Sequence, residues 1–437
     1  MKKVIIAGAG HAGLVLASKL PASEFDVLII EKNSRENLGH DWEDRFTFEL
    51  LESVTGKSIN DFPDNSWRYR GDSAFISPSK RTSVPVTYSE NDKQKVMWRK
   101  PLINMLITSA EKAGARFIYN TDITGPIIAE GRVTGIKTDK EEYYADIVVD
   151  CAGVFSPVRS NLPEEYMIER NPGRGDLFYA WRAYFDKCSD INPELPFEVY
   201  MYHEREQGLS WCCTNENSVD ILIGRIDKLT DEKVNEQIAI FRENHPWIGS
   251  SIINGGSYGY IPVRRPLSVM VADGYAAAGD SAFMTMPMNG MGIDLSIKAG
   301  IILSEVLAEN IDKDYTADVL WEYNRRFHTE CGAEASKNEG LKNAILSLPY
   351  EGVDFLFENG IIQSSDLAGA GKKTSFISLL GKLKRGLKKP KYLFAILSGI
   401  IKGSKNAGVY KNPPAVYNKE KIVQWKDQIE KNIVKIL

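Results

Sequence analysis

The segment Gly8-Ala9-Gly10-His11-Ala12-Gly13 follows the apolar run Val4-Ile5-Ile6-Ala7 and precedes a helix-like stretch that ends at Pro21. The order of apolar strand, glycine-rich turn and helix is typical of the first βαβ unit of a dinucleotide-binding fold. In this turn the first glycine allows the tight bend, the second admits a pyrophosphate, and the third lets helix and strand pack closely. The helix N-terminus adds free N–H groups and partial positive charge. We therefore assign Gly8, Gly10, His11, Ala12 and Gly13 to a dinucleotide site.

A second apolar run, Val27-Leu28-Ile29-Ile30, ends in Glu31, which lies 18 residues after Gly13. A carboxylate in this place accepts hydrogen bonds from the hydroxyls of the adenosine ribose. Lys32 and Ile123 are assigned to the cofactor site as well.

A second glycine-rich segment, Gly279-Asp280-Ser281-Ala282-Phe283, continues to Gly290-Met291-Gly292. Asp280, at the end of a predicted strand, is placed to accept from a ribityl hydroxyl, and residues 290–292 begin the next predicted helix. That helix N-terminus would face the flavin edge on which reduced flavin carries negative charge. One glycine motif leaves NAD and FAD open, whereas the ordered pair indicates FAD. The residues assigned to this half of the site are Gly279, Asp280, Pro287, Gly290, Met291 and Gly292.

The chain has 437 residues, which suggests two or three domains, and its composition is that of an ordinary globular protein. It shows no signal peptide and no apolar run of the roughly 20 residues that a membrane-spanning helix needs. The 5 cysteines are odd in number and lack metal-binding spacing, so we expect no metal site, reduced thiols and a cytoplasmic protein.

The pattern of elements predicts an α/β fold with three parts. A discontinuous Rossmann-type FAD-binding domain is expected over residues 1–70, 91–164 and 262–310. An antiparallel β-sheet substrate domain is expected over residues 71–90 and 165–261, where strand-like aromatic runs dominate. Residues 311–437 are expected to form a helical C-terminal region. A β-hairpin is predicted to turn at Glu130-Gly131.

Charge is unevenly distributed along the chain. The formal net charge is −4, but residues 372–437 hold 16 Lys and Arg against 3 Asp and Glu. Leu and Lys alternate at helical spacing from Leu379 to Lys389. This pattern fits either a solvated helical tail or a surface for anionic lipid headgroups or an acidic partner. We therefore weigh a peripheral position on the inner face of a membrane, and we expect no nucleic-acid partner.

The order of motifs resembles that of the glutathione-reductase-type flavoproteins. GxGxxG is followed by Trp98-Arg99, by Asp150-Cys151-Ala152-Gly153 with Ser156 and Arg159, and by Gly279-Asp280. Within those flavoproteins it resembles the group that contains aromatic hydroxylases, flavin halogenases and geranylgeranyl reductases, over roughly residues 1–310. The resemblance implies that Arg99 contacts the pyrophosphate and ribityl region of FAD.

Details of the second motif distinguish the branches of that group. Phe283 stands where aromatic hydroxylases usually have His, and the W-x-W-x-I-P motif of flavin halogenases is absent from the sequence. The pattern from Gly279 to Gly300 looks more like geranylgeranyl reductases and FixC-type dehydrogenases. Geranylgeranyl reductases carry Y-x-W-x-F-P on a substrate-domain strand, of which this chain keeps only Trp211. That departure puts a prenyl substrate in more doubt than the reduction chemistry.

Catalytic and substrate-binding residues are assigned more loosely. His40 and Asp41 follow the second strand, in a loop that often reaches the flavin in this fold, and are candidate proton donors. Cys212 is a third catalytic candidate, although only one of Cys212 and Cys213 is able to face a pocket. The residues proposed to line a pocket for a small apolar or aromatic substrate are Tyr179, Trp181, Trp211 and Met286.

Together these patterns predict an FAD-dependent oxidoreductase that reduces C=C bonds of a prenyl-like or other apolar substrate. One alternative is a single-component FAD monooxygenase acting on an aromatic or polyketide substrate. Another is an electron-transfer flavoprotein that passes electrons to quinone. Since no second GxGxxG marks a nicotinamide domain, the electron donor is either NAD(P)H, bound transiently, or a ferredoxin.

Overall fold

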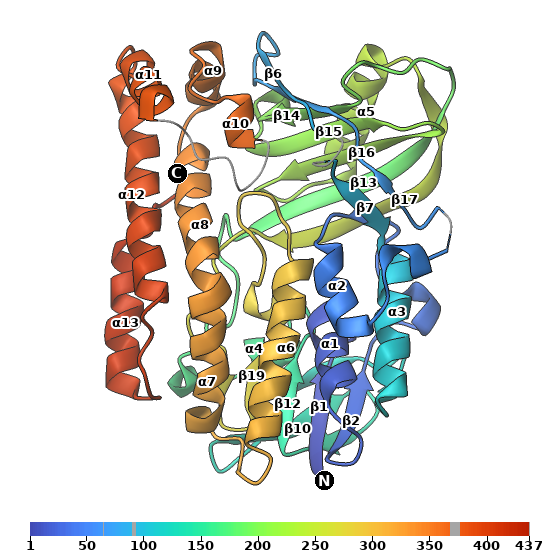
Figure 1. Ribbon diagram of the computed structural model, residues 1–437, viewed down its shortest axis with the longest axis vertical. Coiled ribbons are helices and arrows are strands. Elements are labelled where there is room, and N and C mark those ends of the chain that lie inside the picture. The colour runs from blue at the N-terminus through green and yellow to red at the C-terminus, as the bar shows by residue number, and fades with distance from the viewer. Residues whose placement is uncertain (64, 90–92, 368–375, 437) are drawn as a thin grey trace.

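The computed structural model describes residues 1–63, 65–89, 93–367 and 376–436. Within this part of the chain the strands form four sheets, and the C-terminal quarter is helical (Figure 1). The structure confirms the predicted α/β class. The strongly basic region predicted from residue 372 onward includes residues 372–375, which lie outside the described residues.

A six-stranded sheet holds the glycine-rich turn at the carboxyl ends of its strands. Its strand order is β18-β19-β12-β1-β2-β8, and β1 runs parallel to both β2 and β12. Helices α1, α3 and α6 pack on one face of this sheet (Figure 1). The strands are β1 (Lys2–Ala7), β2 (Phe25–Ile30), β8 (Arg116–Ile118), β12 (Ile147–Asp150), β18 (Val271–Ala272) and β19 (Tyr275–Ala277). The helices are α1 (His11–Lys19), α3 (Arg99–Lys112) and α6 (Ile293–Glu309).

A three-stranded antiparallel sheet lies against the same strands through contacts of β10 with β12 and of β11 with β1. It consists of β9 (Ile123–Ala129), β10 (Arg132–Thr138) and β11 (Glu142–Tyr144). The hairpin between β9 and β10 turns at Glu130 and Gly131, which both have positive φ, of 51° and 73°. Two left-handed residues in a two-residue loop match the twist of the flanking strands. The predicted hairpin is confirmed.

A seven-stranded sheet of order β17-β13-β16-β15-β14-β5-β6 forms a second body (Figure 1). Helix α5 (Asp231–Asn244) packs on one face of it. Strands β5 and β6 reach this sheet from an early excursion of the chain, and β14 pairs with β5 in parallel. The strands are β5 (Ser73–Ile76), β6 (Ser83–Val86), β13 (Leu177–Lys187), β14 (Phe197–Met201), β15 (Gly208–Thr214), β16 (Ser218–Arg225) and β17 (Ile248–Pro262).

A small sheet of order β3-β7-β4 connects the two bodies. Its strands are β3 (Glu43–Asp44), β4 (Trp67–Tyr69) and β7 (Lys95–Trp98), and α2 (Phe48–Thr55) follows β3. A short strand and a loop precede α2, because residues 43 and 44 pair with β7.

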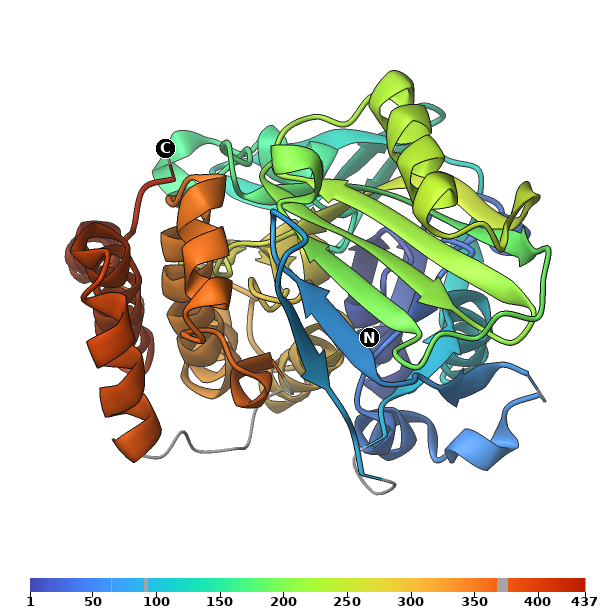
Figure 2. The same ribbon diagram turned by 90° about the horizontal axis from the view of Figure 1, so that it is seen from above.

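The C-terminal helices stand together at one side of the molecule (Figure 2). Helices α8 and α12 cross closely at three glycines: a Cβ on Gly340 would lie 2.5 Å from the Gly399 carbonyl oxygen and 2.6 Å from the Gly403 Cα. None of the helices in the described ranges is long and apolar enough to cross a bilayer. The helices are α7 (Ala317–Phe327), α8 (Ala333–Leu346), α9 (Tyr350–Glu358), α10 (Ser364–Leu367), α11 (Phe376–Gly386), α12 (Pro390–Tyr410) and α13 (Lys419–Lys431).

Polar side chains of α8 fasten these helices to the segments that link the two bodies. The buried Lys342 Nζ donates to the carbonyl oxygens of Gly175 and Val263, at 3.0 and 2.5 Å. Glu339 pairs with the buried Arg265 at 3.2 Å. Because each of these groups is buried, losing a partner would leave an unsatisfied charge. The helical region is therefore part of the folded core.

Candidate functional site

The glycine turn after β1 allows two close backbone approaches. Gly8 has φ of 90°, and a Cβ there would lie 2.7 Å from the Cys151 carbonyl oxygen; a Cβ on Gly13 would lie 2.6 Å from Ile6 Cγ2. Gly10 is the N-cap of α1 and offers no side-chain cap. The first N–H groups of α1 are therefore not capped by a side chain, as a site for a pyrophosphate requires.

Glu31 shapes the same turn from the end of β2. Its buried carboxylate accepts from the backbone N–H of Ala9 and of Asn33, both at 2.9 Å. A carboxylate has further lone pairs, so these bonds leave acceptor capacity for a ribose hydroxyl. Lys32 next to it is exposed, and Ile123 begins β9 with a half-buried side chain against the core.

The buried Asp150 at the end of β12 joins the two glycine-rich segments. Its carboxylate accepts from the hydroxyls of Ser156, Ser281 and Tyr275 at 2.5, 2.9 and 2.9 Å, and from the backbone N–H of Ala152 at 3.1 Å. Ser281 belongs to the second segment, about 130 residues further along the chain. The Asp150 motif therefore has a structural role, since it holds the second segment against the first.

The second segment places Asp280 at the carboxyl end of the sheet. Gly279 before it has φ of 67°. Asp280 is exposed to solvent but has many protein atoms around it, and the resulting desolvation raises its pKa to about 6 although the Arg99 charge opposes this. Further on, Gly290 has φ of 70° and Gly292 is an N-cap of α6 without a side-chain cap. The N-termini of both α1 and α6 thus lack side-chain caps.

Arg99, the first residue of α3, forms a bidentate ion pair with Asp44 of β3. The distances from Nε and Nη2 to the two carboxylate oxygens are 2.6 and 2.7 Å. Burial by itself raises the pKa of Asp44, but the Arg99 charge and its hydrogen bonds outweigh burial and hold the pKa below the ordinary value. The charges of Arg99 and Asp280 also attract each other, which raises the pKa of Arg99 and lowers that of Asp280. Asp44 was missed in the sequence, where nothing distinguishes it from other acids of the loop.

His40 and Asp41 lie beside a cavity near Arg99. They line a cavity of about 300 Å³ together with Trp98, Lys100 and Asn254, among others. The His40 ring stacks on Trp42 with centroids 4.5 Å apart. Burial and then the Arg99 charge lower the pKa of His40 to about 4, so its imidazole is neutral at pH 7. Asp41 pairs with Lys100 at 2.8 Å.

His11, inside the glycine turn, is also neutral at pH 7. Burial and then the Arg99 charge lower its pKa to about 4. Its Nε2 is buried and has no hydrogen-bond partner among the described residues. An orphaned polar atom beside the turn fits a site that a polar ligand completes.

One face of the seven-stranded sheet is joined to the loop that carries Trp42 and Glu43. The buried Arg182 of β13 pairs with Asp220 at 2.8 and 2.7 Å and donates to the Glu43 carbonyl oxygen at 2.7 Å. The absence of a side chain at Gly259 admits Trp42, since a Cβ there would lie 2.4 Å from the Trp42 ring. We call this the inner face of the sheet, because it looks toward the FAD-binding body.

Trp211 lies on the inner face and is half-buried. Its ring lies edge-on to that of Phe197 at 5.7 Å, and the Arg182 guanidinium lies 5.1 Å from its centroid. Its indole Nε1 is buried without a hydrogen-bond partner in the described residues. Of the residues assigned to a substrate pocket, Trp211 is therefore one that faces the FAD-binding body.

Trp181 and Cys212 lie on the outer face, which α5 covers. Both belong to a core cluster with Ile238 and Phe241 of α5 and are 7% and 1% exposed. Burial raises the pKa of the Cys212 thiol well above its ordinary value. The predicted pocket role of Trp181 and catalytic role of Cys212 do not fit this placement. Strand alternation sends one of two neighbouring side chains to each face, and the sequence did not show which face α5 would cover.

The two other pocket candidates lie nearer to the FAD-binding body. Tyr179 shares the outer face with Trp181 but lies closer to the strand end, where its ring meets that of Tyr260 at 5.6 Å. Met286 is half-buried against the main core. By contrast Phe283 and Met284, in the second glycine-rich segment, are fully buried and belong to the core itself.

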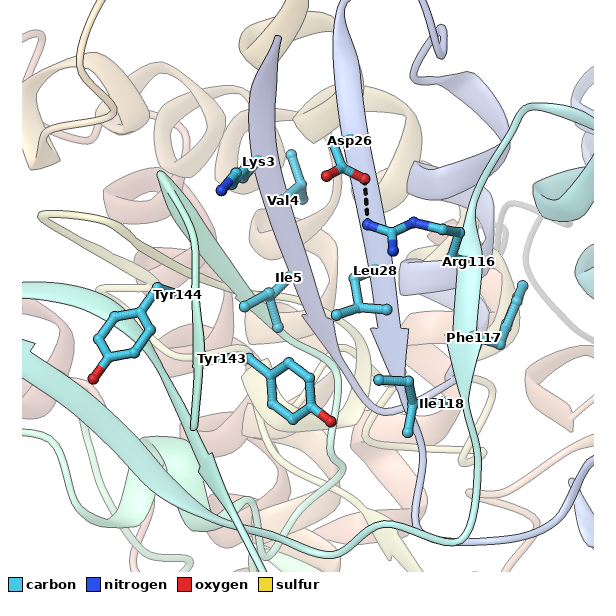
Figure 3. Close-up of a pocket in the computed structure, with 10 residues that line it drawn as sticks. All are labelled: Lys3, Val4, Ile5, Asp26, Leu28, Arg116, Phe117, Ile118, Tyr143 and Tyr144. Carbon is cyan, nitrogen blue, oxygen red and sulfur yellow. Dashed lines mark hydrogen bonds and ion pairs between the residues drawn. The ribbon is translucent and has the colours of Figure 1, made fainter. Parts of the chain in front are cut away.

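A larger cavity, of about 420 Å³, lies elsewhere on the six-stranded sheet (Figure 3). Ile5, Leu28 and Ile118 form its apolar floor beneath Tyr143, and at one end of it Asp26 pairs with Arg116 at 2.7 Å. It lies over the middle and amino ends of the strands, whereas ligands of open α/β sheets bind beyond the carboxyl ends. This cavity is therefore separate from the cofactor site.

Comparisons with known proteins agree with this geometry. Residues 1–333 match the family model described as "FAD binding domain". The chain belongs to this FAD-binding family. The match, together with both glycine segments and the two helix N-termini, establishes an FAD-dependent oxidoreductase.

Relatives of similar length are found among archaeal reductases. The digeranylgeranylglycerophospholipid reductase of Methanothrix thermoacetophila is 23% identical over 378 residues, which are 84% of this chain and 92% of that protein. The second such reductase of Methanococcoides burtonii is 27% identical over 91% of this chain and 95% of its own. FixC of Escherichia coli is 24% identical over 75% of this chain and 81% of its own. The resemblance predicted from the motifs is confirmed.

Solved structures show the same fold. A geranylgeranyl bacteriochlorophyll reductase-like protein of Thermoplasma acidophilum aligns with a TM-score of 0.71 at 19% identity, covering 91% of this chain and 99% of its own. The halogenase PltM in complex with FAD and phloroglucinol aligns with a TM-score of 0.61 at 13% identity, covering 99% and 96%.

Proposed function

We propose that this protein uses FAD to reduce carbon–carbon double bonds of a prenyl-chain lipid. The observation that carries the proposal is the similarity, along most of both chains, to reductases named for a digeranylgeranyl lipid. The inner face of the sheet supports it, because aromatic and aliphatic side chains gather there. These are Trp42, Trp98, Phe178, Leu209, Trp211, Leu222 and Ile261.

The residues of the cofactor site fit FAD. The N-terminus of α1 would hold the pyrophosphate, Glu31 the adenosine ribose, Asp280 a ribityl hydroxyl, and the N-terminus of α6 the electron-rich flavin edge. Bound FAD, once reduced by the electron donor, would supply the hydride for the alkene. The inner face would orient the chain and exclude water.

The alkene also needs a proton at its other carbon. His40 and Asp41 remain our candidates, since they line one cavity at the edge of the site. With a pKa of about 4, His40 presents a neutral ring at pH 7 and would relay a proton through its two nitrogens rather than store one. Asp41, paired with Lys100, would hold the adjoining loop.

The test is an anaerobic reoxidation. The FAD-loaded protein is reduced with dithionite, and geranylgeranyl lipids, their saturated analogues and aromatic compounds are added separately. Reoxidation by the unsaturated lipid alone, with a saturated product, is expected. A flavin that waits for oxygen and then hydroxylates an aromatic compound would replace the proposal by the monooxygenase alternative. Electron transfer to quinone without a reduced lipid would favour the FixC-like alternative.

For the electron donor we propose NADPH, NADH or a reduced ferredoxin, bound transiently. Anaerobic mixing of the oxidised protein with each donor, followed at the flavin absorbance band, distinguishes them. The physiological donor is expected to reduce the flavin at least as fast as the lipid is turned over.

We also propose that the outward face of α12 and the turn before it rest on an anionic membrane. Leu387, Phe394 and Ile401 are 61%, 64% and 54% exposed. Exposed lysines alternate with them, namely Lys384, Lys388, Lys389, Lys391 and Lys405. Apolar side chains that enter the headgroup region, flanked by cations, are typical of interfacial helices. Such a surface would bring the enzyme to a lipid substrate.

Vesicle sedimentation tests this surface. Binding to anionic vesicles that contain phosphatidylglycerol should fall steeply as the salt concentration rises. Phe394→Asp should weaken it, whereas Ile252→Asp, at a 49% exposed position on β17, should not. Equal binding to neutral vesicles, or equal loss in both variants, would contradict the proposed surface.

A further inference from the structure

Two arginines beside the inner face, Arg45 and Arg70, have no carboxylate partner. In the described part of the chain neither guanidinium has an ion pair or a hydrogen bond, and Arg70 Nε is buried without an acceptor. The Arg70 guanidinium lies 4.3 Å from the Phe197 ring centroid and 5.9 Å from that of Trp211. Arg45 follows β3 and is half-buried. Both side chains therefore hold charge in partly desolvated positions without a carboxylate in ion-pair contact.

Neighbouring arginines, unlike these two, each have a carboxylate partner. Arg68 pairs with Glu43 at 2.7 and 2.6 Å, Arg99 with Asp44, and Arg182 with Asp220, each through two hydrogen bonds. A buried or half-buried guanidinium normally finds such a partner, because an unpaired charge away from water is costly. The two exceptions indicate a place where the partner comes from outside the chain.

Arg45 and Arg70 directly follow β3 and β4, the two strands that flank β7, and their charges repel each other. Burial lowers the pKa of Arg45, and the charge of Arg70 lowers it further, while Tyr88 and Asp294 act in the opposite sense. Asp294 acts on Arg45 only at a distance and forms no ion pair with it, since its carboxylate accepts from the backbone N–H and hydroxyl of Thr47 at 2.8 and 2.7 Å. An anion between the two arginines would relieve both the repulsion and the desolvation.

This pair is distinct from the group that surrounds the FAD phosphates. Arg99, Asp44, Asp280 and His11 act electrostatically on one another. Arg45 instead interacts electrostatically with Asp294, in the first turn of α6. Arg70 lies against Trp211 on the inner face. The pair therefore adjoins the flavin and substrate end of the site.

We propose that Arg45 and Arg70 bind a phosphate group, the polar head of a prenyl-chain substrate. Guanidinium groups match phosphate oxygens through paired hydrogen bonds, and Phe197 and Trp211 would receive the first carbons of the chain. The nature of the chain rests on the proposed function. The anion site itself rests only on the two unpaired arginines.

The experiment measures binding rather than turnover, with FAD-loaded protein and isothermal titration calorimetry. The probes are geranylgeranyl monophosphate, geranylgeraniol and inorganic phosphate. The variants are Arg45→Gln, Arg70→Gln and the conservative Arg70→Lys. The control is Arg116→Gln, which removes an exposed, paired guanidinium from a distant strand. FAD content and unfolding midpoint show that each variant is folded.

In the wild type we expect the monophosphate to bind at least ten times more tightly than the alcohol. Each Gln variant should lose about tenfold in affinity for the monophosphate, as expected for one charge-assisted hydrogen-bond pair, and nothing for the alcohol. Arg70→Lys should recover part of the loss, and Arg116→Gln should match the wild type.

Equal affinities for alcohol and monophosphate, or no effect of the Gln variants, would overturn the anion site. Inorganic phosphate that binds as tightly as the prenyl ester, in an arginine-dependent way, would support the site and identify a free anion as its ligand. If no alkene reoxidises the reduced flavin while arginine-dependent binding persists, the proposed function fails and the anion site stands.

Discussion

The two faces of the seven-stranded sheet differ in what covers them and in where their charged side chains lie. On the outer face Trp181, Phe185 and Cys212 pack under α5 in a closed apolar cluster. On the inner face Trp211 has an indole N–H without a partner among the described residues, and Arg70 close by has no counter-ion there. The same strands build both faces, so the difference comes from what covers them.

This comparison teaches where function lies in such a sheet. The face covered by α5 is filled by an apolar cluster of the same chain, although Arg242 Nε of α5 and His203 Nδ1 next to Phe241 are also buried without a partner in the described residues. A face that looks onto a cofactor-binding body keeps polar groups in need of partners, and in native proteins such groups commonly mark a site. The following experiments disturb one face or the other.

The largest effect on stability is expected from breaking the buried pair on the inner face. Arg182→Met leaves Asp220 fully buried and uncompensated, which costs about 3–5 kcal/mol of unfolding free energy. The double variant Arg182→Met/Asp220→Leu removes both charges and should be more stable than the single variant. Urea denaturation followed by circular dichroism measures both. A double variant less stable than the single one would contradict this account.

The next effect concerns FAD. Arg99→Gln should weaken FAD binding at least tenfold, about 1.4 kcal/mol, because a charged donor near the phosphates is lost and Asp44 is left without its partner. Flavin fluorescence titration of the apoprotein gives the dissociation constant. Arg116→Gln, paired at the surface far from the turn, is the control. An unchanged constant in Arg99→Gln would remove Arg99 from the cofactor site.

A direct contrast between the faces uses neighbouring residues. Cys212→Ala should lower the unfolding free energy by about 1 kcal/mol through lost packing and leave lipid-driven flavin reoxidation unchanged. Trp211→Phe should slow reoxidation at low lipid concentration, because it changes the wall that the substrate meets. Stopped-flow absorbance compares the two variants. Slower reoxidation in Cys212→Ala would return this thiol to the active site.

The smallest effect is a pH dependence of the apoprotein. The pKa of Asp280 is about 6 in the folded protein and close to 3.8 when unperturbed, so folding favours the protonated form. Its contribution to stability is therefore present at low pH and is lost as pH rises through about 6. The stability difference between wild type and Asp280→Asn should widen, in favour of the variant, between about pH 4 and pH 6 and then level off. A constant difference would contradict the raised pKa.

Much of the fold could be predicted because the signals are local. The turn at Gly8–Gly13 lies between strand and helix in one short stretch, and the turn at Glu130-Gly131 depends on two adjacent residues. The second glycine segment was recognisable by its order relative to the first. The partner of Arg99 was not, because Asp44 lies 55 residues away and only the pairing of β3 with β7 brings the two together.

The sequence by itself determined the cofactor class, the α/β architecture and the family, since glycine spacing and strand-end acids are written along the chain. Only the tertiary structure decided which side of the seven-stranded sheet is available to a ligand. Alternation sorts residues into two faces, but the packing of α5 selects one of them, which removed Trp181 and Cys212 from the site. The lack of a carboxylate partner for Arg45 and Arg70 is likewise visible only in the tertiary structure, because it depends on which residues are their neighbours in space.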